Sequence, residues 1–355
     1  MRFIRTLFLI SLIAIGIFFL FDQFDGSTDE VTDKISNVVK EKKNLLESKV
    51  MPEERQPEMP LKGDVYQWIG KSSDELTETL GDPIRKDDSA YGYTWWVYTD
   101  HSSQYIQFGI QDNEISTIYA TGKDLDVNPV QVGQSYKEIN EQFSFLDEVN
   151  YSKGVSTYNF HLNAEDLEMR PLVKVTDDLF IQFYFDTFTK KLSSIRVLTA
   201  DVLLKHRQYE IEYRGKLPNE PDLSDEAWAK VDSGMEKQIF DITNVMRNQY
   251  DKSKLKWEED VSEVAFMHSK DMAENNYFSH DSLDGRGLKE RLAVKDIFYL
   301  SAGENIAAQY PDAPAAMEGW LNSEGHREAL LNDAYTHLGA GVHQLYYTQN
   351  FLGKP

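Results

Sequence analysis

Cysteine is absent from this chain of 355 residues. Disulfide bonds, thiolate nucleophiles and cysteine-ligated zinc are therefore excluded, and any metal site must use histidine, aspartate or glutamate. Positive charge is also scarce, because 37 Lys and Arg residues stand against 59 Asp and Glu residues and give a net charge of −22. Such an acidic chain repels nucleic acids and anionic lipid headgroups, so we expect no nucleic-acid partner.

The common catalytic signatures are missing as well. The sequence contains neither the Gly-x-Ser-x-Gly turn of serine hydrolases nor the His-Glu-x-x-His helix of zinc proteases. Gly70, Lys71 and Ser72 resemble the end of a phosphate-binding loop, but Val65 stands where that loop needs a glycine. We therefore expect no nucleotide site.

The amino-terminal residues predict a membrane segment. Arg2 and Arg5 precede an uncharged run over residues 6–21, and Asp22 and Asp25 follow it. This charge order favours a cytoplasmic amino terminus and an extracytoplasmic body. No small-residue cleavage site follows the run, so we expect a single-pass anchor in the cell membrane. The alternative is a protein secreted after signal cleavage, because the run is shorter than the roughly 20 residues of a spanning helix.

The length of the chain exceeds that of one usual hydrophobic core, so two folded domains are expected. Residues 23–60 are rich in acids, lysines and prolines, which is typical of a linker or stalk. A second Pro-rich stretch near residue 220 predicts an interdomain linker. The predicted organisation is an anchor at 1–22, a stalk at 23–60, a first domain at 61–200, a linker at 201–225 and a second domain at 226–355.

The first domain contains a weak internal repeat. Residues 70–80 align with residues 133–143, and each copy has a turn glycine, a serine that can cap a helix and an amphipathic helix. Two apolar segments with strand-like alternation follow each helix, at 106–110 and 115–118 and again at 181–185 and 192–195. The sequence therefore predicts an α+β domain made of two helix-plus-hairpin repeats.

The second domain begins with a predicted long helix. Ser224 can cap it, and the acidic residues that follow suit the positive end of the helix dipole. Its apolar face is formed by Trp228, Val231, Met235, Ile239, Ile242, Val245 and Met246. A second helix is predicted from about Val261, and His268 on it is interpreted as a packed structural histidine.

A series of short segments then carries a family resemblance. These segments lie at residues 243–247, 255–257, 265–272, 277–280, 303–306, 320–327 and 338–342. In this order they resemble the CAP superfamily of cysteine-rich secretory proteins, antigen 5 and pathogenesis-related proteins, in its bacterial SCP-like branch. The repeat region is similar to the CAP-associated N-terminal domain of membrane-anchored Bacillus-type proteins. The resemblance implies an α-β-α sandwich for the C-terminal domain.

The resemblance also implies a cleft with two histidines and two acidic residues, which in some members holds a divalent metal. His280 takes the first histidine position, Glu304 the first acidic position and His326 the second histidine position. Ser323 stands where the eukaryotic pattern has the second acid, and Glu324 can replace it only if the turn points its side chain inward. The structural part of the motif comprises Asn305, Trp320 and Arg327.

Two functions follow from these residues. His280, Glu304 and His326 would suffice as ligands of zinc or magnesium and leave a place for water, which suits a metal-dependent protease or cell-wall hydrolase. Alternatively, the polar residues are structural and the cleft binds an envelope lipid, glycan or peptide, or a protein partner. The incomplete acidic pair favours the binding protein, with or without a metal, and the sequence leaves enzymatic activity open.

Overall fold

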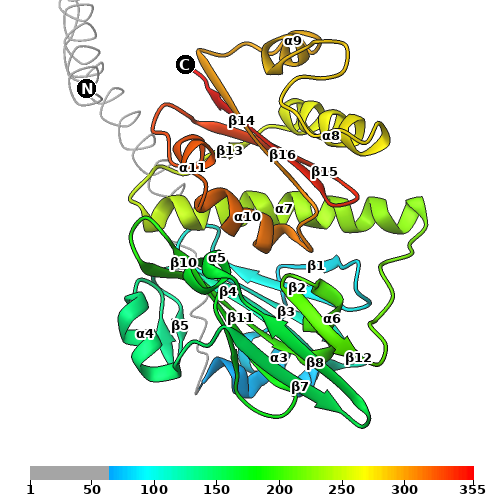
Figure 1. Cartoon of the computed structure of the whole chain (residues 1–355). Coiled ribbons are helices and arrows are strands. Elements are labelled where there is room, and N and C mark those ends of the chain that lie inside the picture. Colours follow the sequence, from blue (N-terminus) through cyan, green and yellow to red (C-terminus); the bar gives the residue numbers. More distant parts are fainter. Residues whose placement is uncertain (1–63) are drawn as a thin grey trace, which may run out of the picture. The chain divides into compact units, whose positions relative to one another are not determined.

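A computed structural model describes residues 64–355 of the chain (Figure 1). The predicted anchor at 1–22 and the predicted stalk at 23–60 lie outside these described residues. Among the residues that are described, no helix is both long and apolar enough to cross a membrane.

The amino-terminal part of the described chain is a mixture of short helices and antiparallel strands. In chain order these elements are η1 Val65–Trp68, α3 Ser73–Leu80, β1 Arg85–Asp88, β2 Thr94–Thr99, β3 Tyr105–Gln111, β4 Glu114–Thr121, β5 Asp126–Val127, β6 Val130–Gln131, α4 Tyr136–Phe143, β7 Glu148–Lys153, β8 Ser156–His161, α5 Ala164–Met169, β9 Leu172–Lys174, β10 Leu179–Asp186, β11 Lys191–Thr199, α6 Ala200–His206 and β12 Glu210–Arg214.

The two predicted helix starts are confirmed. Ser72 accepts the N–H of Glu75 at 3.2 Å, and the Glu75 carboxylate accepts the N–H of Ser72 at 3.1 Å. Ser135 and Glu138 repeat this reciprocal pair at the start of α4, with distances of 3.3 and 3.1 Å. Each pair satisfies two backbone donors that a helix start leaves free, which explains why the serine and the glutamate recur at the same spacing.

The predicted hairpins are also confirmed, and they join in one sheet. β3 pairs with β4 and β10 pairs with β11, all antiparallel. β4 then pairs with β11, with Ala120 opposite Ile195, so the two repeats meet at the centre of a seven-stranded sheet of order β1-β2-β3-β4-β11-β10-β9. The α+β class expected from the repeat is the observed one.

A second sheet was not expected from the sequence. β12 pairs with β8, and β8 pairs with β7, in a three-stranded antiparallel sheet. The predicted linker at 201–225 therefore differs from the structure, because α6 and β12 occupy residues up to Arg214. The strand was missed because it is only five residues long and mostly exposed, although Ile211 and Tyr213 alternate with charged residues along it.

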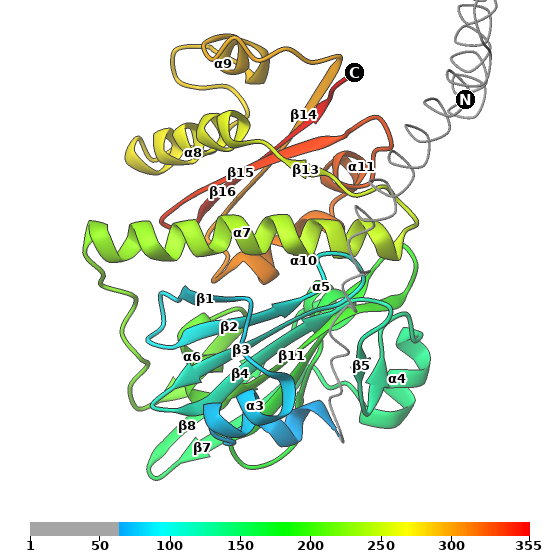
Figure 2. The same cartoon turned by 180° about the vertical axis from the view of Figure 1, so that it is seen from behind.

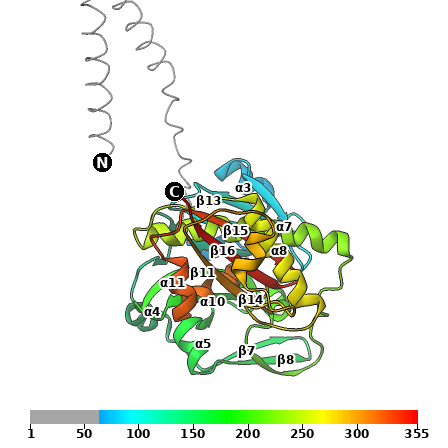
Figure 3. The ribbon, with the colours of Figure 1, turned by 90° about the horizontal axis from the view of Figure 1, so that it is seen from above.

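The carboxy-terminal part begins with the longest described helix, α7 Asp225–Gln249, which Ser224 caps as predicted. The remaining elements are β13 Lys256–Trp257, α8 Glu259–Glu274, α9 Leu288–Ala293, β14 Ser301–Ala308, α10 Ala313–Leu321, α11 Glu324–Leu330, β15 His337–His343 and β16 Tyr346–Gly353. The strands form a four-stranded sheet of order β13-β15-β16-β14. α8 packs over β15 and β16 on one face, while α7 and α10 cover the other, which is the expected α-β-α sandwich (Figure 1). Figure 3 looks down on this sheet from the side of α8.

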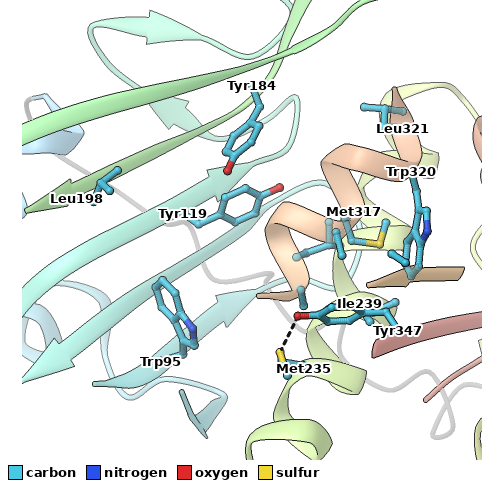
Figure 4. Packing of buried hydrophobic residues seen from close by; sticks show 14 of the residues in the cluster. Trp95, Tyr119, Tyr184, Leu198, Met235, Ile239, Met317, Trp320, Leu321 and Tyr347 are labelled. Atoms are coloured by element: carbon cyan, nitrogen blue, oxygen red, sulfur yellow. Dashed lines mark hydrogen bonds between the residues drawn. The ribbon is translucent and has the colours of Figure 1, made fainter. Parts of the chain in front are cut away.

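The two sheets share a layer of helices. α7 and α10 lie between the four-stranded and the seven-stranded sheet (Figures 1 and 2). Figure 4 shows Trp95, Tyr119 and Tyr184 on the strands of the large sheet, with Met317 of α10 and Met235 of α7 on the facing helices. These side chains belong to one buried apolar cluster, so residues 64–355 form a single compact unit. The helical layer thus fixes the sheet that carries Glu304 against the repeat domain.

Candidate functional site

The site is centred on Glu304, which lies on β14 and faces His280. His280 belongs to the loop between α8 and α9, and its Nδ1 lies 3.0 Å from the Glu304 carboxylate. The His280 side chain is 57% exposed, whereas that of Glu304 is only 4% exposed. The buried carboxylate therefore holds a histidine ring whose other nitrogen is available to a ligand.

Arg291 completes the arrangement from α9. Its guanidinium contacts the second oxygen of Glu304 at 2.5 Å, and its side chain is 7% exposed. The same guanidinium donates to the carbonyl of His280 at 2.8 Å and to that of Arg286 at 3.1 Å. Arg291 thus fixes both the carboxylate and the loop that carries the histidine.

These contacts set the charges of the site. Burial opposes ionisation of Glu304, but the hydrogen bond from His280 and the charge of Arg291 outweigh it and lower its pKa. The hydrogen bond to Glu304 raises the pKa of His280. Burial and then the charge of His280 lower the pKa of His326. The site consequently favours an imidazolium at His280 and a neutral ring at His326.

His326 lies on α11 beside this group and is held through its backbone. Asn305, which is fully buried, donates from its amide to the carbonyl of His326 and to the side chain of Gln349, both at 3.1 Å. Trp320 donates from its indole to the carbonyl of Ile306 at 3.0 Å. Asn305 thus connects β14 to α11, and Trp320 connects α10 to β14.

Arg327 is fixed by the repeat domain. Its guanidinium contacts both carboxylate oxygens of Asp186 on β10, at 3.0 and 2.9 Å. Asn322 accepts the N–H of Thr187 and donates to the carbonyl of Phe185, at 2.8 and 3.0 Å. The large sheet thus holds the segment that carries His326.

The alternative acidic residues do not join the group. Ser323 is the residue before α11, and its side chain makes no cap hydrogen bond. Glu324 begins α11 and is exposed. Within residues 64–355, neither side chain forms a hydrogen bond or ion pair with His280 or Glu304. Their part in the cleft stays a prediction.

A metal centre of the predicted kind does not fit this geometry. Glu304 uses one oxygen on His280 and the other on Arg291, so it orients the histidine instead of standing free as a ligand beside it. Across residues 64–355, no group of three or more His, Asp or Glu side chains is arranged to hold a metal ion. Because the Arg291 guanidinium neutralises the Glu304 carboxylate, only the imidazoles of His280 and His326 would remain as ligands for a divalent cation.

Arg291 and Asp186 are the residues that sequence reasoning missed. Each forms an ion pair with a motif residue that is not its neighbour in the sequence: Arg291 with Glu304, and Asp186 with Arg327. Neither lies in a recognised segment. The only local signal is their residue type, because a buried carboxylate and a buried guanidinium each require an opposite charge.

The titration of His280 provides a direct check of the site. In the native chain its pKa is expected above the ordinary 6.5, and Glu304→Gln is expected to lower it, because the acceptor loses its charge. A raised native pKa means that this group stabilises the fold below pH 6.5, and the contribution is lost as pH rises through the native pKa. Ring signals in an NMR pH titration measure both values, and an unchanged pKa in the variant would contradict the assignment.

Known proteins resemble the chain along its whole length. The CAP-associated N-terminal domain model matches residues 69–209, and the cysteine-rich secretory protein family model matches residues 240–353. The uncharacterized membrane protein YlbC of Bacillus subtilis is 44% identical over 358 residues, which cover 100% of both chains. A second Bacillus subtilis protein, YkwD, is 36% identical over 34% of this chain and 48% of its own length.

Solved structures agree with these sequence matches. An extracellular protein with an SCP domain from Bacillus anthracis is 38% identical, with a TM-score of 0.79 over 86% of this chain and 100% of that one. A cysteine-rich secretory protein from Staphylococcus aureus is 28% identical, with a TM-score of 0.70 over 82% of this chain and 94% of that one. The chain therefore belongs to the cysteine-rich secretory protein (CAP) family, with a CAP-associated N-terminal domain preceding its CAP domain.

Proposed function

We propose that this chain is a membrane-anchored extracytoplasmic protein that binds an envelope ligand through the cleft at His280. The observation that carries the proposal is an exposed imidazole whose proton is secured by a buried, ionised carboxylate. Such a ring donates a charge-assisted hydrogen bond from its free nitrogen. The ligand therefore presents an acceptor: a phosphate, carboxylate or carbonyl oxygen of a lipid, glycan or peptide.

Exposed apolar side chains support a binding role for the same region. The stretch from just before His280 to just before Glu304 leaves five large apolar side chains exposed by 55–70%, namely Phe278, Leu283, Val294, Phe298 and Leu300. Large apolar groups gathered on a surface are typical of interaction sites. They supply contact for the apolar or ring portion of a ligand whose acceptor reaches His280.

The proposed location rests on the amino-terminal charge order and on the relatives. Arg2 and Arg5 before the apolar run favour export of the body. The YlbC relative is named a membrane protein, and the Bacillus anthracis relative is named extracellular. Both descriptions agree with an anchored protein that meets its ligand outside the cytoplasm.

The proposal is tested by titrating envelope fragments into residues 57–355, which contain the compact unit. The fragments are glycerol phosphate oligomers, soluble muropeptides and phosphatidylglycerol vesicles. His280→Ala is expected to weaken binding of the recognised fragment about 10- to 100-fold, the value of a lost charged hydrogen bond of about 1.5–3 kcal/mol.

His101 provides a matched control. Its ring is 55% exposed, and its Nδ1 lies 2.8 Å from Asp241, whose other oxygen contacts Arg85 at 3.0 Å. The same chemical arrangement therefore occurs away from the cleft, and His101→Ala should leave affinity unchanged. Equal losses in both variants, or a loss in neither, would contradict the proposal.

A further inference from the structure

A cavity of about 740 Å³ lies at the amino-terminal half of α7. α8 and the turn between β15 and β16 complete its walls. None of His280, Glu304 and His326 lines it. The cavity is therefore separate from the proposed cleft, and its residues have no part in the arrangement described above.

Two carboxylates one helical turn apart form one wall. Asp232, whose side chain is 4% exposed, accepts the N–H of Gln344 with one oxygen at 3.1 Å. Glu236 likewise accepts the N–H of Val342 with one oxygen at 3.1 Å. Within residues 64–355, no donor forms a hydrogen bond with the second oxygen of either. Nδ1 of His343 lies 3.8 Å from the second carboxylate oxygen of Asp232, which is too long for a hydrogen bond.

The charge around these two groups is strongly negative. The other acidic side chains that line the cavity are Asp225, Glu259, Glu263 and Glu274. The basic groups there are His343, whose pKa burial lowers, and Lys270, which lies 3.6 Å from Glu274. Burial raises the pKa of Asp232 and of Glu236 to about 7. A buried and a half-buried carboxylate without a cationic partner indicate a site that a positively charged ligand completes.

Aromatic rings line the same cavity. Trp228 on α7 and Phe266 on α8 are lining residues, and the Phe266 ring packs edge-on against His343 at 5.8 Å. Aromatic faces attract organic cations. A hard metal ion would instead need a compact cage of six or more oxygens, and no metal-holding group of His, Asp or Glu is found in the described part of the chain.

We propose that this cavity binds a primary ammonium group on an aliphatic chain, with Asp232 and Glu236 as its counter-ions. The cavity is large enough for a chain of several carbons beside the aromatic walls. The same chemistry occurs in a free diamine and in a lysine side chain of a peptide. Binding of one and not the other identifies the source.

The test is a calorimetric titration of residues 57–355 with 1,5-diaminopentane and with N-acetyl-lysine amide at pH 8. At least one of them is expected to bind saturably, while 1-pentanol does not. Asp232→Asn and Glu236→Gln are each expected to weaken binding at least tenfold. Both substitutions keep the oxygen that accepts a backbone N–H, so the fold is retained, and a thermal melt checks this.

The pKa values of the two carboxylates allow a test that needs no substitution. With pKa values of about 7, Asp232 and Glu236 ionise as pH rises from 6 to 8, while the amine stays protonated. Affinity in the native chain is therefore expected to rise about tenfold for each carboxylate over this interval. Affinity that is equal at pH 6 and pH 8 would count against the two carboxylates as counter-ions.

Glu226→Gln is the matched control. Glu226 lies on the same helix, is exposed and does not line the cavity, yet its substitution removes the same charge. If it weakens binding as much as Asp232→Asn, the amine responds to the overall negative charge of the protein and the cavity site is disproved. Failure of both amines to bind would overturn the proposal as well.

Discussion

Replacement of Arg196 by alanine is expected to lower the free energy of unfolding by about 3–5 kcal/mol, the usual cost of removing one partner of a buried ion pair. Arg196 lies on β11 with a fully buried side chain, and it contacts Asp312 at the start of α10 at 2.8 Å. Without the guanidinium, the carboxylate would stay buried between sheet and helix with no compensating charge.

The substitution should also disturb contacts beyond the Arg196–Asp312 ion pair. Arg196 also lies 2.9 Å from Nδ1 of His206, whose other nitrogen lies 2.9 Å from the Tyr93 hydroxyl. Because β11 belongs to the repeat domain and α10 to the CAP domain, the variant weakens the contact between them.

Equilibrium denaturation monitored by fluorescence measures the effect of Arg196→Ala. Arg286→Ala is the control, because Arg286 and its partner Asp284 are both about half exposed and such pairs contribute about 0–1 kcal/mol. Similar losses in the two variants would contradict the importance of the buried pair.

Glu318→Gln is expected to change how stability depends on pH. Glu318 on α10 is fully buried and accepts hydrogen bonds from the hydroxyls of Ser193, Ser194 and Tyr119. Burial raises its pKa from 4.5 to about 7, although these hydrogen bonds oppose the shift. The folded chain therefore holds this proton more tightly than the unfolded chain does.

The direction in which stability changes with pH follows from that difference in proton affinity. Between pH 4.5 and pH 7 the unfolded chain releases the proton first, so the native protein loses stability as pH rises. From pH 5 to pH 8 the loss amounts to about 2–3 kcal/mol, and a glutamine, which cannot ionise, avoids it. The stability of Glu318→Gln relative to the native chain should therefore rise by that amount.

Denaturation at pH 5 and pH 8 measures this change. Glu324→Gln, an exposed glutamate on the neighbouring helix α11, provides the control and should show no such trend. A difference between Glu318→Gln and the native chain that stays constant with pH would show that Glu318 does not titrate between 5 and 8.

The elements that could be predicted from the sequence are those with local causes. Ser72 and Ser135 predict the starts of their helices because a capping glutamate lies three residues after each serine. β12 was not predicted, because its alternating pattern is only five residues long and the strand pairs with β8, a partner about 50 residues away.

The residues of the candidate site also divide into those identified from local motifs and those that were not identified. His280 and Glu304 were singled out because each lies in a short motif, and the structure places Nδ1 of His280 3.0 Å from the Glu304 carboxylate. Arg291 was not found, although it changes the chemistry most, because its partner is identified only once α9 packs beside β14. A hydrolase would need Glu304 as a free base or ligand, and the structure commits both of its oxygens.

The proposed function depends on a protonated His280 that the cleft offers to an envelope ligand. The most direct test follows the ring signals of His280 and His326 by NMR in residues 57–355 while envelope fragments, and separately zinc, are added. We expect the recognised fragment to shift the His280 signals and to raise the pKa of His280, while zinc leaves the signals of both rings unchanged. Micromolar zinc that abolishes the proton titration of both histidines, with no response to any fragment, would contradict it.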